Sequence, residues 1–384
     1  MSVTAPRGFV AGGVACGIRR RAPDLAVVRS IPPTTAAAMF TRNRVKAAPL
    51  AVSQKHMDVA DPQAVVINSG VANAATGVPG RHAASATAVA AARLLGLAAE
   101  QVLVLSTGLI GVPLPVDKIR NGLAKLCPRL DGEGGPAAAE AIMTTDSHPK
   151  QIVVPGNGFT VGGMAKGAGM IHPSLATMLA VITTDYPLQR GEGIEFLRPA
   201  VEASFNRISV DGECSTNDAV ILLANGAAGV PRDDTAFAAA LNSACADLSR
   251  QIVADGEGSS VIIEIAVSGA DTDEEAAAIA RRVATSQLVK TAAFGRDPNW
   301  GRVLAAAGSA TCNGGFARLD PDLLTLSFNG SIVFENGEPT SSEPSMADAV
   351  LRIDLGLGLG SGEAAYLASD LTYDYVRINA EYTT

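Results

Sequence analysis

The stretch KGAGMIHPSLATMLAVITTD, residues 166–185, joins a glycine-rich turn to an apolar run that contains several β-branched residues. Short apolar runs of this kind are typical of strands buried on both faces. Residues 178–185 are therefore predicted to form a buried strand that holds whatever precedes it firmly in place. Thr177 stands where the turn meets this run, directly after Ala176.

Similar runs recur on both sides of this stretch and alternate with alanine-rich helical segments. Residues 64–68 (AVVIN) and 102–105 (VLVL) are predicted strands, and residues 81–97 between them are a predicted helix. Residues 152–164 have the pattern of a hairpin that closes at Pro-Gly-Asn-Gly, residues 155–158. The pattern predicts strand–helix–strand units and hence an α/β protein with sheets covered by helices.

The remaining chain supports the same class. Residues 234–255 are predicted to be helical, and residues 261–267 (VIIEIAV) alternate as a strand with one wet face does. Residues 373–380 (YDYVRINA) are also predicted to form a strand. The segment DGEGGPAAA, residues 131–139, is the best candidate for a linker or flexible loop.

Composition excludes several classes of function. A chain of 384 residues with 47% hydrophobic content can bury a large core, but aromatics are only 4%, so that core must be built from small aliphatic side chains. The formal net charge of −8 argues against a nucleic-acid partner, because binding to phosphates requires clustered Lys and Arg. No window reaches about 18 consecutive apolar residues, and no signal-peptide pattern opens the chain, so neither a membrane span nor export is expected.

The cysteines and histidines predict neither disulfides nor a metal site. Five widely spaced cysteines without a CxxC pair fit a reducing cytoplasm rather than a disulfide framework or a thiolate zinc site. Four scattered histidines form no HExxH motif. We expect no bound metal.

Two glycine-rich segments are candidates for nucleotide-binding sites. In DLGLGLGSG, residues 354–362, glycines recur at every second position and never give GxGxxG, so a tight turn is the better interpretation. In GGMAKGAG, residues 162–169, Lys166 stands among glycines. This segment could hold an anion through backbone N–H groups, or it could be a mobile loop with a solvated lysine. We expect no nucleotide cofactor.

Hydroxyl groups suggest acyl chemistry at two places. Thr107 and Gly108 follow the strand VLVL, where the Thr107 hydroxyl and the Gly108 N–H could stabilise an oxyanion. The alternative is that the same residues form a capping turn after the strand. Thr177 would become a strong nucleophile if the Ala176–Thr177 bond broke, because its freed α-amine, with a pKa near 8, could act as the base. The alternatives are that Thr177 merely starts a buried strand, or that residues 175, 178, 179 and 182 form one face of a helix.

Polar residues are also concentrated at three places in this apolar chain. They are FNRISVDGECSTND (205–218), DGEG (255–258) with Glu257, and DPNWGR (297–302) with the single tryptophan. Each alone is explained by a turn, but together they exceed what turns require.

With these motifs assembled, the sequence resembles the ornithine acetyltransferase family, the glutamate N-acetyltransferases of arginine biosynthesis. The resemblance covers essentially the full chain, and the order of the motifs is specific. They are NSGVANAATG, STGLIG, AIMTTD, GGMAKGAGMIHPSLATML, FNRISVDGECSTND, QIVADGEG, VKTAAFGRDPNWGR, DLTYDYVRIN and AEYTT.

The resemblance implies a layered αββα-type sandwich with a second, smaller α/β region. It further implies self-cleavage between Ala176 and Thr177 into an alpha chain (1–176) and a beta chain (177–384), with Thr177 as nucleophile and Thr107 and Gly108 as the oxyanion hole. The implied substrate contacts are Thr144, Lys166, Thr177, Glu257, Asn379 and Thr384.

The implied reaction moves an acetyl group from N2-acetylornithine to L-glutamate through an acetyl-threonine ester, in two half-reactions. It requires no cofactor, although acetyl-CoA is a possible alternative donor, and the family suggests a heterotetramer of two alpha and two beta chains. Two other hypotheses are kept. One is a self-processing N-terminal-nucleophile hydrolase, such as an aminopeptidase or amidase, and the other is a non-catalytic metabolite-binding protein.

Overall fold

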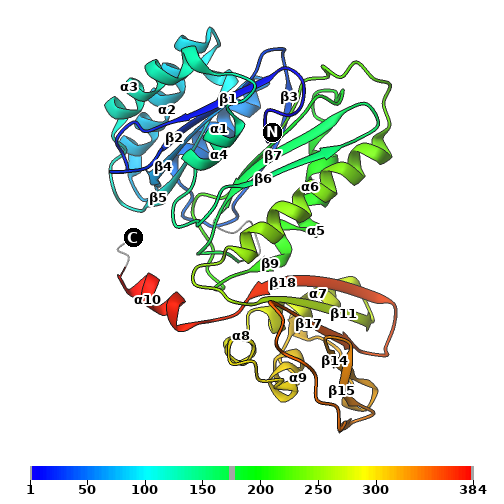
Figure 1. Ribbon diagram of the computed structural model, residues 1–384. Coiled ribbons are helices and arrows are strands. Elements are labelled where there is room, and N and C mark those ends of the chain that lie inside the picture. The colour runs from blue at the N-terminus through cyan, green and yellow to red at the C-terminus, as the bar shows by residue number, and fades with distance from the viewer. Residues whose placement is uncertain (1, 173–177, 382–384) are drawn as a thin grey trace.

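The computed structural model describes residues 2–172 and 178–381, and the mixed α/β class expected from the sequence is confirmed. Two sheets lie against each other in one part of the molecule, and a third sheet occupies the other end (Figure 1). The first sheet has the order β1-β2-β4-β5, and β4 and β5 run parallel as the strand–helix–strand prediction requires. Its strands are β1 (Phe9–Val14), β2 (Leu25–Ser30), β4 (Ala64–Val71) and β5 (Val102–Leu109).

The second sheet contains the strand predicted after Thr177. Its order is β3-β10-β8-β7-β6, with β8 at the centre, parallel to β10 and antiparallel to β7. The strand prediction is confirmed and the helix-face alternative is wrong, because β8 forms ladders on both sides. The predicted hairpin is β6–β7. The strands are β3 (Thr35–Phe40), β10 (Ala219–Ala224), β8 (Leu179–Thr184), β7 (Thr160–Lys166) and β6 (Lys150–Pro155).

Alternating side chains place the two sheets between two layers of helices. Ile67 and Leu105 of the first sheet meet Val181 and Ile221 of the second in a shared core. The other faces of the strands are equally apolar, since alternate residues point to opposite sides. Helices α1 (Ala48–Val59), α2 (Gly77–Leu95) and α3 (Val116–Leu126) cover the first sheet, and α5 (Gly193–Ala203) and α6 (Asp234–Ala254) cover the second.

The third sheet has the order β16-β15-β14-β17-β11-β18-β9 and packs against three helices. The strand predicted at 261–267 is β11. The strands are β9 (Ile208–Ser209), β11 (Ile262–Ala270), β14 (Thr325–Phe328), β15 (Ser331–Glu335), β16 (Glu338–Pro339), β17 (Val350–Gly356) and β18 (Gly362–Ser369), and the helices are α7 (Asp273–Ala284), α8 (Gln287–Phe294) and α9 (Trp300–Gly308). A separate two-stranded sheet pairs β12 (Thr311–Cys312) with β13 (Gly315–Phe316).

The strand predicted at 373–380 is wrong, because these residues form helix α10 (Tyr373–Glu381). Local hydrogen bonds outweigh the strand preference of its aromatic and β-branched residues. The Tyr375 N–H donates to Thr372 Oγ1 at 3.1 Å, and Arg377 pairs with Asp374 one turn earlier. None of the residues of α10 is buried, and Figure 1 shows the helix apart from the helices that cover the sheets.

The linker predicted at 131–139 is also wrong. Helix α4 (Gly135–Ala141) begins inside it, and Asp131 forms a backbone bridge with Ala11 of β1. The alanines Ala138, Ala139 and Ala141 are fully buried in the core between the sheets, because only small side chains fit there. Across residues 2–172 and 178–381, no helix has both the length and the apolarity that a bilayer crossing requires.

Candidate active site

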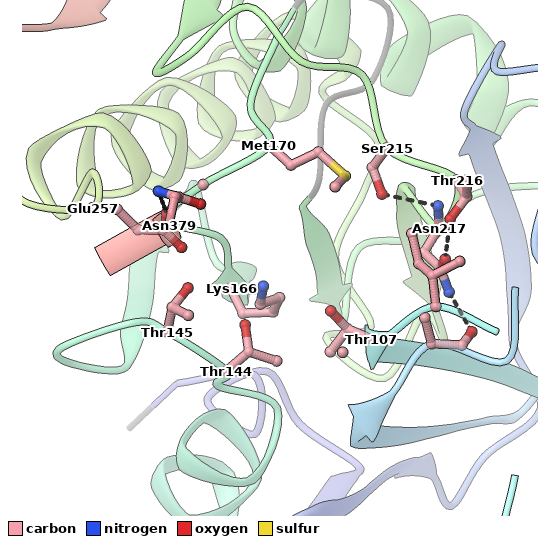
Figure 2. A pocket seen from close by; sticks show the side chains of 14 residues that line it. Thr107, Thr144, Thr145, Lys166, Met170, Ser215, Thr216, Asn217, Glu257 and Asn379 are labelled. Carbon is pink, nitrogen blue, oxygen red and sulfur yellow. Dashed lines mark hydrogen bonds between the residues drawn. The ribbon is translucent and has the colours of Figure 1, made fainter. Parts of the chain in front are cut away.

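One pocket collects side chains from segments that are far apart in the sequence (Figure 2). Thr144, Thr145, Lys166, Glu257 and Asn379 lie on one side of it in the view, and Thr107 lies opposite with the polar segment 215–217. The complete lining consists of Ala72, Thr107, Gly108, Ile110, Thr144, Thr145, Lys166, Gly169, Met170, Ser215, Thr216, Asn217, Glu257 and Asn379.

The pocket contains all six predicted site residues that the structure describes. These are Thr107, Gly108, Thr144, Lys166, Glu257 and Asn379. The remaining predicted positions, Ala176, Thr177 and Thr384, lie outside the described residues. Met178, which follows Thr177 in the sequence, is buried and donates its N–H to Asp218 Oδ1 at 3.1 Å.

Thr107 and Gly108 lie within strand β5 rather than in a turn after it, so the capping-turn alternative is wrong. The ladder with β4 is irregular at Gly70 and Val71, and the Gly108 backbone has φ +125°. A Cβ at Gly108 would lie 2.3 Å from the carbonyl carbon of Gly70, so only glycine fits. This irregular end of β5 brings the Thr107–Gly108 backbone to the pocket wall.

Lys166 is the last residue of β7 and is 2% exposed, so the solvated-lysine alternative is wrong. Burial lowers the pKa of the Lys166 ammonium, and the Asp146 carboxylate, whose Oδ2 lies 3.7 Å from Nζ, opposes that shift. The cation therefore reaches the pocket from the end of a rigid strand.

A buried network of charges supports this side of the pocket, and sequence reasoning missed it. Lys150 Nζ donates to Asp146 Oδ1 at 2.8 Å and to Asp255 Oδ2 at 2.5 Å. Asp146 also accepts the N–H groups of Thr144 at 2.9 Å and Gly167 at 2.6 Å. Burial alone would raise the pKa of Asp146, but the ammonium groups of Lys166 and Lys150 hold it well below its usual range. The available signal is the aspartate that ends the motif AIMTTD.

Glu257 lies in the turn that follows α6, Asn379 lies on α10, and the two meet in the pocket. Asn379 Nδ2 donates to Glu257 Oε2 at 2.8 Å. Glu257 in turn lies so close to Gly169 that a Cβ there would be 2.5 Å from the carboxylate. The backbone also fixes this approach, since Glu257 N–H donates to Ala168 O at 2.8 Å. One side of the pocket thus carries a carboxylate as well as the Lys166 cation.

The polar segment before β10 forms the opposite side. Asn217 Nδ2 donates to the carbonyl oxygens of Ala72 and Ser106, both at 2.7 Å, and its Oδ1 accepts from Thr216 Oγ1 at 2.6 Å. Burial raises the pKa of Asp218 well above its usual range, and the hydrogen bond from Met178 N–H offsets only part of that shift. Residues 205–218 are recognisable in the sequence as unusually polar, but no role was predicted for Asn217.

Across residues 2–172 and 178–381, no three His, Cys, Asp or Glu side chains are grouped so that they could hold a metal ion. The side chains that line the pocket offer hydroxyl, amide, ammonium and carboxylate groups. Such a set can bind a zwitterionic small molecule by charge pairing and hydrogen bonding.

Comparison with known proteins gives full-length similarity. The ArgJ family model matches residues 10–384. Proteins named arginine biosynthesis bifunctional protein ArgJ are 46% identical over 395 residues in Mycolicibacterium paratuberculosis (100% of this chain, 96% of the relative) and 45% identical over 389 residues in Streptomyces coelicolor (100% of both). A solved ornithine acetyltransferase complexed with ornithine, from Mycobacterium tuberculosis, is 44% identical over 46% of this chain and 96% of that chain, with a TM-score of 0.42.

Proposed function

The chain belongs to the ArgJ family of bifunctional acetyltransferases in arginine biosynthesis, and we propose that it transfers acetyl groups from N2-acetylornithine to L-glutamate through a threonine ester. The observation that carries the proposal is the convergence of six residues, predicted from separate motifs, on one pocket that holds both a cation and a carboxylate. N2-acetylornithine carries an α-carboxylate and a side-chain ammonium, and so matches this pair.

Self-cleavage between Ala176 and Thr177 would create the nucleophile. It would divide the chain into residues 1–176 and 177–384, which stay together as one αββα-type sandwich with a smaller α/β region. Strand β8 supports this assignment, because it begins two residues after Thr177 and is held by ladders on both sides. The strand that follows the cleavage point is held on both sides, and covalent catalysis requires a nucleophile that is held in position.

The reaction then proceeds in two half-reactions. In the first step, Thr177 Oγ attacks the acetyl carbonyl carbon while the α-amine of Thr177 accepts the hydroxyl proton. The C–N bond to ornithine then breaks, and the α-amine passes this proton to the departing amine of ornithine. The amine of glutamate attacks the resulting ester, and the Thr177 oxygen leaves and regains its proton. No cofactor takes part in either step.

Thr107 and Gly108 would stabilise the oxyanion that develops on the acetyl oxygen in both steps. The Gly108 backbone supports this role, because its positive φ is open only to glycine and both residues line the pocket. Lys166 would pair with the substrate carboxylate, and Glu257 with the charged side chain of ornithine. Thr144, Asn379 and Thr384 would supply further substrate contacts.

Two measurements on the purified protein test the proposal. Intact mass spectrometry should find two chains that meet at residues 176 and 177, and incubation with acetylornithine and glutamate should give ornithine and N-acetylglutamate in equal amounts. Release of free acetate, or of ornithine without N-acetylglutamate, would favour the hydrolase hypothesis. A single uncut chain of 39.1 kDa without transfer would favour the binding protein. Replacing acetylornithine by acetyl-CoA tests the alternative donor.

We also propose that the enzyme is cytoplasmic and assembles as two alpha and two beta chains. The five unpaired cysteines support the location. Two apolar side chains on α10, Tyr373 at 83% and Val376 at 59% exposed, support assembly, because contact with a second copy would cover them. Light scattering should give a mass twice the 39.1 kDa of one chain, and a mass equal to one chain would contradict the assembly.

A further inference from the structure

Two neighbouring residues join the two facing sheets at the pocket. Asn217 Nδ2 uses both of its protons on the first sheet, one on Ser106 O in β5 and one on Ala72 O just after β4. The next residue, Asp218, accepts the N–H of Met178 just before β8 in the second sheet. The Ala219 N–H also donates to Met178 O at 3.2 Å. A single dipeptide thus connects the segment before Thr107 with the segment after Thr177.

Such a connection is needed because the packing between the sheets is not directional. The core between them consists of apolar side chains, and burial of apolar surface fixes no particular offset between two faces. Hydrogen bonds prefer narrow ranges of distance and angle, and two bonds of 2.7 Å from one amide define an offset closely. Catalysis depends on such offsets, because a displacement of about 1 Å can lower a rate roughly 10²-fold.

We propose that Asn217 is a positioning residue that sets the separation between the Thr107–Gly108 segment and the start of β8. The inference rests on the proposed function, in which these segments carry the oxyanion hole and the nucleophile. Asn217 acts through the Ser106 and Ala72 carbonyls and takes no part in bond making. Its amide is suited to this task because it can donate twice through Nδ2 while Oδ1 accepts from Thr216.

The chain provides a matched control at the opposite end of the same strand. Asn225 follows β10, and its Nδ2 donates to Arg7 O at 2.9 Å and to Ser30 Oγ at 3.1 Å. Ser30 is the last residue of β2 in the first sheet, so Asn225 also joins the two sheets, but it does not line the pocket. Asn217→Ala and Asn225→Ala each remove an amide with two donated bonds.

The experiment compares the two variants with the native enzyme. Mass spectrometry first measures the cut fraction, and kcat and KM are then expressed per cut enzyme. We expect Asn217→Ala to lower kcat roughly 10²-fold with KM within about threefold of native, because Lys166 and Glu257 are supported elsewhere. Asn225→Ala should keep the native kcat even where its melting temperature falls. Equal kcat in both variants, or a change in KM alone, would overturn the inference.

A second substitution covers the case in which Asn217→Ala does not fold. Asn217→Asp keeps the shape but turns a carboxylate oxygen toward two carbonyl oxygens, and protonation restores one donor. A carboxyl group buried at this place has a raised pKa, so the ratio of variant to native kcat should rise between about pH 8 and about pH 5. A ratio that is constant with pH would contradict the positioning role. Absence of transfer in the native enzyme would instead contradict the proposed function.

Discussion

Lys150 donates to Asp146 at 2.8 Å in a place where neither side chain has any exposed surface. The same ammonium also binds Asp255, 2.5 Å away and 5% exposed. The pair is not part of the pocket lining, yet Asp146 holds the Thr144 N–H and Asp255 lies two residues before Glu257. The ion pair of Lys150 and Asp146 connects two segments that carry pocket residues. Lys150 holds the short hydrogen bond to Asp146, and the Lys166 ammonium lies farther from Asp146, at 3.7 Å.

Replacing Lys150 should therefore destabilise the protein strongly. Lys150→Met leaves two buried carboxylates without their shared cation, and we expect the free energy of unfolding to fall by about 3–5 kcal/mol in urea denaturation. Adding Asp255→Asn to that variant should recover part of the loss, because it removes one unpaired charge. The control is Arg377→Met in the exposed pair with Asp374, which should cost less than about 1 kcal/mol. Similar losses in both pairs would contradict the prediction.

Asp146 should make stability depend on acid pH. Its folded pKa lies below the unfolded value of about 3.9, so its contribution is present above that value and is lost as pH falls toward the folded pKa. The difference in unfolding free energy between the native protein and Asp146→Asn should therefore shrink from about pH 5 to about pH 2. Denaturant titrations across this range measure it. A constant difference would show that the charge of Asp146 adds nothing.

Lys166 should give activity an alkaline limit. Because burial lowers its pKa below the ordinary value of 10.5, the cation is lost at a lower pH than in an exposed lysine. We expect kcat/KM to decline as pH rises through that pKa, mainly through KM, since an uncharged amine binds a carboxylate weakly. Lys166→Arg should have a lower kcat/KM but lack this decline, because a guanidinium stays charged. A decline of the same size in both enzymes would assign the limit to another group.

A side chain at Gly169 should weaken the binding of acetylornithine. In Gly169→Ala the new Cβ would fall 2.5 Å from the Glu257 carboxylate, which must then move away from Asn379. We expect KM for acetylornithine to rise roughly tenfold, the effect of about 1.4 kcal/mol of lost binding. The control is Gly308→Ala at the end of α9, where a Cβ meets no atom within 4 Å. An unchanged KM in Gly169→Ala would show that Glu257 does not bind this substrate.

Thr177→Ala should leave the chain uncut and inactive. Without the hydroxyl, neither the attack on the Ala176 carbonyl nor the acetyl ester can form, and we expect one 39.1 kDa band on a denaturing gel. Thr177→Ser keeps the hydroxyl and should cut and transfer more slowly. Thr183→Ala is the control, because that hydroxyl donates to Val3 O within the core. Transfer by uncut Thr177→Ala enzyme would exclude Thr177 as the nucleophile.

Strands that are buried on both faces were predictable, since β4, β5 and β8 each begin with four consecutive apolar residues. Among the described residues, six of those that line the pocket were also predictable from motifs, because each motif keeps its chemical groups within a few residues of one another. Asn217 lines the same pocket and was not predicted. Helix α10 was not predictable by the same reasoning. Its residues favour a strand by composition, and the Thr372 cap and the Asp374–Arg377 pair decide the outcome.

The sequence by itself determined which segments are buried strands and which motifs carry polar and nucleophilic groups, because apolar periodicity and functional groups are local properties of the chain. Only the tertiary structure decided that Lys166 ends a buried strand, that Lys150 neutralises two carboxylates, and that Asn217 joins two sheets. Those contacts link residues up to 145 positions apart. Their partners are chosen by how the sheets pack, and no local pattern of residues specifies that packing.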